Sequence, residues 1–144
     1  MEDHLVQLLK SKYSFIVGEF VRFSRDNWGV AINDEINAAR IVGIIDKLIV
    51  SIEQNDPSII RQEAERAAQT RLGETHNPDA VAQLWEWGEL FFVRLIQENL
   101  GADPQKDEYI TRIHTFARPA RRVIADASLD QLKPKKPYDT NHGY

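Results

Sequence analysis

The chain has 144 residues, of which 42% are hydrophobic and 28% are charged, values that suit one globular domain with a buried core. Its net charge of −4 argues against a general nucleic-acid binder, which is normally basic. The absence of cysteine excludes disulfides, thiolate metal sites, cysteine nucleophiles and thioether-attached chromophores. The N-terminus lacks the basic region and apolar run of a signal peptide, so we expect a cytoplasmic protein.

The N-terminal part of the chain predicts two helices. Residues 2–25 carry an apolar stripe at the spacing of one helix face, and the turn-forming residues 24–29 end it. A second helix is predicted over residues 34–53, with Asn33 as its N-cap. Its apolar side is rich in isoleucine, a β-branched residue that also favours strands. The length of the segment and its 3.6-residue period indicate a helix instead.

A polar capping residue followed by proline opens each of the three remaining predicted helices. The pairs are Asp56-Pro57, Asn77-Pro78 and Asp103-Pro104. The cap accepts a hydrogen bond from the first turn, and the N–H that proline lacks would have no partner there. The helices are predicted over residues 57–72, 78–100 and 104–127. Because Pro119 lies inside the last of them, we expect a kink near residues 115–118.

Five helices without a strand pattern predict an all-α fold, either a five-helix bundle or a globin-like packing. The apolar pattern stops near residue 129, and lysines and prolines follow, which predicts a disordered, extended C-terminal tail. We therefore divide the chain into a single helical domain, residues 1–128, and a basic tail or linker, residues 129–144. Charged residues interrupt the most apolar segment, which argues against a membrane span.

Four aromatic residues gather on the fourth predicted helix: Trp85, Trp87, Phe91 and Phe92. The apolar face of this helix is far wider than the roughly 100° stripe of a surface helix. That face could belong to the core, form a homodimer interface or line an apolar ligand pocket. A glycine in the helix interior, Gly88, predicts a close approach by another backbone.

Four arginines on the fifth predicted helix form a second candidate site: Arg112, Arg118, Arg121 and Arg122. Guanidinium groups pair with phosphate and carboxylate through two parallel hydrogen bonds, so this set could hold a phosphate or an acidic partner. The alternative is a solvated face whose arginines pair with nearby carboxylates.

Two histidines are candidate cofactor ligands. His114 lies within the fifth predicted helix and His76 precedes the aromatic helix, and either could be an axial ligand of haem. The alternatives are a partly buried histidine with a hydrogen-bond partner and a loop residue. No glutamate is followed three residues later by a histidine, as a di-iron bundle requires, so we predict no metal site. Phosphate-binding and nucleophile-elbow motifs are also absent, so we predict no catalytic residues.

One stretch of the chain carries a set of features that also occurs in a known family. A helix ends in the acidic turn Asn55-Asp56, Ala68 and Arg71 precede Gly73, and a long apolar helix follows. On these features residues 48–100 resemble the N-terminal helical domains of bacterial stressosome RsbR-like co-antagonists. The resemblance implies a globin-like fold without haem that dimerises through its helices and passes signals to a partner or output domain. It carries over no ligand-binding residue.

Taken together, these features predict a non-enzymatic bacterial sensor, signalling or protein-interaction domain that acts as a helical homodimer. We expect no cofactor, no nucleic-acid partner and no membrane contact, and the homodimer could in addition contact a separate signalling protein. The alternative is a haem- or tetrapyrrole-binding, globin-like sensor. A small-molecule enzyme is a third possibility, for which Glu86 and Glu89 on one helix face are the available carboxylates.

Overall fold

A computed structural model describes residues 4–28, 34–74 and 78–132. These residues form six helices and no strand, which confirms the all-α prediction. The helices are α1 (His4–Ser11), α2 (Tyr13–Trp28), α3 (Asp34–Gln54), α4 (Pro57–Glu74), α5 (Pro78–Asn99) and α6 (Lys106–Leu132). The predicted tail begins too early, because α6 continues to Leu132; residues 133–144 lie outside the described residues.

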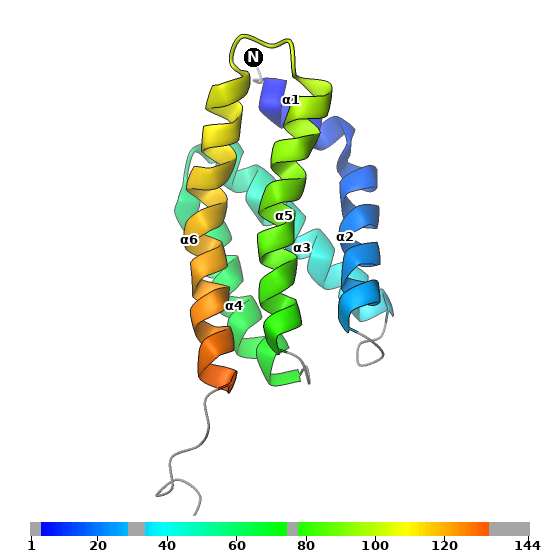
Figure 1. Ribbon diagram of the computed structural model, residues 1–144, viewed down its shortest axis with the longest axis vertical. Coiled ribbons are helices and arrows are strands. Elements are labelled where there is room, and N and C mark those ends of the chain that lie inside the picture. Colours follow the sequence, from blue (N-terminus) through cyan, green and yellow to red (C-terminus); the bar gives the residue numbers. More distant parts are fainter. Residues whose placement is uncertain (1–3, 29–33, 75–77, 133–144) are drawn as a thin grey trace, which may run out of the picture.

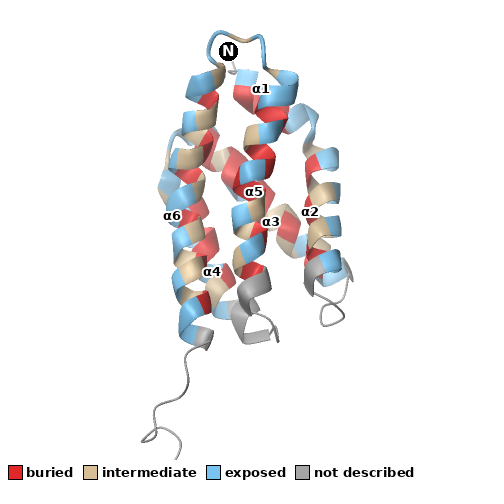
Figure 2. Cartoon of the chain, in the orientation of Figure 1, coloured by how far each residue is buried: buried red, intermediate tan, exposed pale blue. Residues whose placement is uncertain are grey.

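The helices form a bundle of two layers. Helix α5 lies between α2 and α6 in one layer, and α3 and α4 form the other (Figure 1). Helix α6 packs against both α5 and α4, and α3 packs against α4 and α2. Buried side chains follow the inward sides of all the helices, and the outward sides are exposed (Figure 2). Among the described residues, no helix is both long enough and apolar enough to cross a lipid bilayer.

The single helix predicted over residues 2–25 is wrong, because the chain bends at Lys12 into two helices. Backbone hydrogen bonds still reach across the bend, from Lys12 N to Leu8 O and from Ile16 N to Lys12 O. The Ser11 hydroxyl also donates to the Leu8 carbonyl at 3.0 Å, and such side-chain bonds to the preceding turn often bend helices. As a result, α1 crosses one end of the bundle while α2 runs along its side (Figure 1).

The turn between α3 and α4 fixes these helices relative to one another. Asn55 adopts a left-handed conformation (φ 53°), and Asp56 N donates to Ser51 O at 2.9 Å, which together end α3 in a Schellman motif. Asp56 then caps α4 by accepting from the backbone N–H and the hydroxyl of Ser58, and these hydrogen bonds lower the pKa of Asp56. The cap predicted at Asp56-Pro57 is therefore present.

The turn before α6 is also tied to the N-terminal helix. Asp103 accepts from His4 Nδ1 at 2.7 Å and from the Gln105 backbone N–H at 2.8 Å. These hydrogen bonds, that of His4 first, lower the pKa of Asp103. The buried Tyr109 adds a hydroxyl hydrogen bond at 3.3 Å. The cap predicted from sequence thus also connects α1 to the end of the bundle.

A tyrosine–aspartate contact between α2 and α3 gives a prediction for alkaline pH. The Tyr13 hydroxyl donates to Asp46 Oδ1 at 2.7 Å, and partial burial, followed by the Asp46 contact, raises the pKa of Tyr13 to about 12. Because this pKa exceeds the value of about 10 in an unfolded chain, the neutral phenol stabilises the fold fully below pH ~10. That stabilisation is lost as the pH rises from ~10 through 12.

We expect ultraviolet titration of the folded protein to show Tyr13 ionising near pH 12. The variant Tyr13→Phe should lack this late step. The difference in unfolding free energy between the two proteins should shrink above pH ~10. If the tyrosine missing from the titration of Tyr13→Phe were one with the ordinary pKa of about 10, that result would contradict the Asp46 contact.

Candidate functional site

A buried carboxylate, that of Glu89, lies where α5 meets α6. Its side chain is 5% exposed, and its three charged partners among the described residues come from α6. His114 Nδ1 and Arg118 Nε pair with Oε2, the latter at 3.3 Å, and Arg121 Nε donates to Oε1 at 3.0 Å. Because these three residues follow one another at spacings of four and three, they occupy one face of the helix. We call Glu89 and its three partners the Glu89 cluster.

The Glu89 cluster is buried on one side only. The Arg118 side chain is 60% exposed and that of Arg121 36% exposed, so their guanidinium groups reach solvent while the carboxylate does not. The carboxylate therefore needs its partners, because an unpaired buried charge is strongly destabilising. The two arginines could be hydrated without it. The cluster also fastens α5 to α6, the two helices with the most extensive mutual packing.

The four arginines predicted as one site separate into three environments. Arg118 and Arg121 belong to the Glu89 cluster. Arg112 instead donates from Nη2 to the Ile52 carbonyl at 3.3 Å, near the end of α3, where a cation interacts favourably with the helix dipole. Arg122 is exposed, and no hydrogen bond or ion pair joins it to another described residue. Arg112 thus does not share the Glu89 carboxylate with Arg118 and Arg121, and an anion site on this set of arginines stays a prediction.

Sequence reasoning named Glu89 only as an available carboxylate on one helix face and did not predict its burial. A usable indication was available, because Glu89 lies four residues after Trp85 and three before Phe92, on the apolar stripe itself. The matching series of His114, Arg118 and Arg121 on one helix face was a second indication. A carboxylate on an apolar stripe, opposite a basic face, predicts a buried ion pair.

The aromatic residues of α5 are covered mainly by α2. Phe91 and Phe92 are buried, and Trp87 is partly buried, stacked on Phe23 with ring centroids 4.4 Å apart and planes 14° apart. Phe20 also packs edge-on against Trp87, with centroids 5.0 Å apart. Of the three alternatives for this face, a place in the core therefore holds for Phe91 and Phe92.

Gly88 is explained by the same packing. A Cβ atom at this position would lie 2.9 Å from Cε2 of the Phe20 ring. The close neighbour is thus a side chain of α2, and the expectation of a neighbouring backbone is wrong. The glycine is needed because the ring occupies the space that any other side chain would take.

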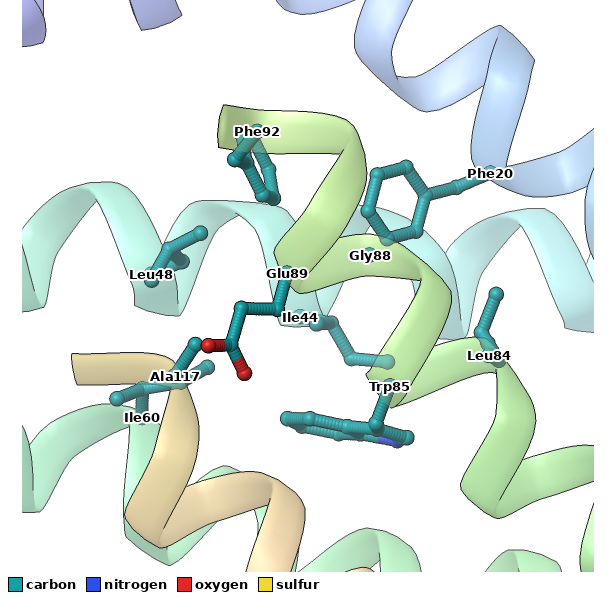
Figure 3. A pocket seen from close by; sticks show the side chains of 10 residues that line it. All are labelled: Phe20, Ile44, Leu48, Ile60, Leu84, Trp85, Gly88, Glu89, Phe92 and Ala117. Atoms are coloured by element: carbon teal, nitrogen blue, oxygen red, sulfur yellow. The ribbon is translucent and has the colours of Figure 1, made fainter. Parts of the chain in front are cut away.

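A small cavity of about 40 Å³ lies beside Gly88 and Glu89 (Figure 3). Its described lining residues come from five helices: Phe20, Ile44, Leu48, Ile60, Leu84, Trp85, Gly88, Glu89, Phe92 and Ala117. The Trp85 indole forms one wall, and its buried Nε1 has no hydrogen-bond partner among the described residues. The lining is otherwise almost entirely apolar.

A larger groove of about 490 Å³ lies on the surface between α2 and α5. Its lining residues are Lys12, Phe15, Glu19, Trp87, Phe91, Arg94, Leu95, Glu98 and Asn99. Phe15 is 52% exposed, and its ring lies 6.1 Å from that of Phe91. We call this surface the α2/α5 groove.

The structure describes one of the two histidines considered as haem ligands. His114 belongs to the Glu89 cluster and is not among the residues lining the small cavity. His76 lies outside the described residues. The described residues contain no group of three or more His, Asp or Glu side chains placed to hold a metal ion.

Comparisons with known proteins add no further constraint. The chain matches no protein-family model, no curated protein and no solved structure. Its function is therefore argued from the geometry alone.

Proposed function

We propose that this chain is a non-enzymatic, cytoplasmic signalling or protein-interaction domain that works as a homodimer through the α2/α5 groove. The observation that carries the proposal is Phe15, a large apolar side chain that is 52% exposed at the edge of a groove. Stable interfaces combine an aromatic and apolar centre with a polar rim. The groove contains both kinds of residue, with Phe15, Trp87 and Phe91 beside the charged residues Lys12, Glu19, Arg94 and Glu98.

The charges of the groove favour a second copy of the same chain as the occupant. A two-fold interface brings the same surface of both copies together, so its charges must complement themselves. Lys12 and Glu19 lie seven residues apart, about two helical turns, and Arg94 and Glu98 alternate in sign on the facing helix. Rotation by 180° would place the cations Lys12 and Arg94 of one copy against the anions Glu19 and Glu98 of the other.

The test compares two exposed apolar residues on different faces. Phe15→Glu places a charge in the groove, and Leu129→Glu places one at a residue of α6 that is 59% exposed and outside the groove. We expect the wild type and Leu129→Glu to be dimers in sedimentation equilibrium at micromolar concentration. Phe15→Glu should raise the dissociation constant about a hundredfold, as the loss of an interface hot spot does. A monomeric wild type, or equal dissociation constants for both variants, would show that the groove is not the interface.

The haem alternative finds no support in the cavity next to α5. Ligand pockets for cofactor-sized molecules measure roughly 300–1,000 Å³, whereas this cavity measures about 40 Å³. His114 also directs Nδ1 to Glu89, away from the role of an axial ligand at that nitrogen. We therefore do not carry that function further.

A further inference from the structure

We propose that the cavity beside Gly88 is a binding site for a small, uncharged, apolar ligand, of the size of a noble-gas atom or a diatomic molecule. The site lies between α5 and its neighbours, and none of its lining residues belongs to the α2/α5 groove. The inference therefore stands independently of self-association.

The chemistry of the walls favours an apolar occupant over water. A buried water needs two to four polar partners. The only carboxylate at the cavity, Glu89, already pairs with three side chains of α6. The other polar group is Trp85 Nε1, which lies at the end of the indole farther from that carboxylate (Figure 3). A water molecule here would thus exchange several hydrogen bonds in bulk for one or two.

The size of the cavity sets the size of the ligand. An apolar protein cavity of about 150 Å³ stays dry and binds benzene or xenon. With about 40 Å³, the present cavity is too small for a ring and large enough for one compact apolar molecule. Such a ligand would gain dispersion contacts with the apolar side chains that line the cavity.

The position of the cavity connects ligand binding to the packing of the bundle. Its walls include Phe20 of α2, Ile60 of α4 and Ala117 of α6, so one ligand contacts three helices that pack around α5. A molecule that binds the folded state alone stabilises it in proportion to the logarithm of its concentration. Occupancy should therefore raise the stability of the whole helical domain.

Xenon is the probe that tests the site, with NMR of dissolved xenon as the first measurement. We expect a saturable shift of the xenon signal on titration with the wild-type chain. Ala117→Val fills the cavity and should weaken xenon binding about tenfold or more. Ala125→Val makes the same change on the same helix, outside the cavity, and should bind like the wild type. Circular dichroism establishes that each variant is folded.

A second measurement keeps the test decisive if valine at position 117 disturbs the fold. Ile60→Val enlarges the cavity by one methyl group and should bind xenon at least as tightly as the wild type, although without xenon it is less stable. Xenon should also raise the melting temperature of the wild type and of Ile60→Val. A wild-type xenon shift that is weak and does not saturate would overturn the proposal. Equal binding by the wild type and a folded Ala117→Val would overturn it as well.

Discussion

The double substitution Arg118→Met, Arg121→Met is expected to lower the free energy of unfolding by about 3 kcal/mol at pH 7. It leaves the Glu89 carboxylate, 5% exposed, with His114 as its only partner from the Glu89 cluster. Breaking a buried ion pair from one side costs about 3–5 kcal/mol because a charge stays buried without compensation. The lower end applies here, since both guanidinium groups are partly solvated and contribute less than buried ones.

Chemical denaturation measures this loss, and two further variants assign its cause. Adding Glu89→Met to the double variant removes the stranded carboxylate and should recover most of the lost stability, because apolar replacements of whole buried ion pairs are often neutral or stabilising. Arg122→Met is the matched control on the same helix and should change stability by less than about 0.5 kcal/mol. If the triple variant is no more stable than the double variant, the stability lost with the arginines does not come from burial of Glu89.

The substitution Phe20→Ala is expected to lower the free energy of unfolding by about 3–5 kcal/mol. Phe20 is 4% exposed, and its ring packs against Trp87, Phe91 and Phe92 and fills the space above Gly88. The substitution therefore removes contacts to four residues of α5 and enlarges the adjacent cavity, and both effects act in the same direction.

Phe15→Ala, on the same helix, is the control for this prediction. Phe15 also neighbours Phe91, but it is half exposed, so its loss should cost the monomer less than about 1 kcal/mol. Denaturation at concentrations below the dimer dissociation constant compares the two variants. Equal losses would mean that the groove residue Phe15 is part of the core.

Local chemistry made most of the helices predictable from sequence. The caps Asp56 and Asp103 act as predicted, because an N-cap depends on hydrogen bonds between residues two or three positions apart. The bend at Lys12 was not predictable in this way. The apolar stripe from Leu5 to Phe23 continues through Lys12 without a break. The bend depends on how α1 packs across the end of the bundle.

The candidate sites were predictable only in part. The sequence identifies Arg118, Arg121 and His114 as chemically notable, but their common partner lies about 25–32 residues away on another helix, and spacing along α6 does not disclose it. The α2/α5 groove and the small cavity depend on the distance between helices, which only packing determines. The tail boundary also moved, because α6 continues to Leu132 although the exposed residues Leu129 and Asp130 do not extend its buried apolar stripe.

The arrangement of the Glu89 cluster has a consequence for the axial register of α6. The basic residues repeat one turn further along, since Arg118 and Arg122 follow His114 and Arg118 by four positions. A slide of α6 by one turn, about 5.4 Å, would bring Arg118 and Arg122 to Glu89. The ion pairs alone therefore do not determine the axial position of α6. Packing does, because the same slide would drive Ile124 into the site of the fully enclosed Ala120.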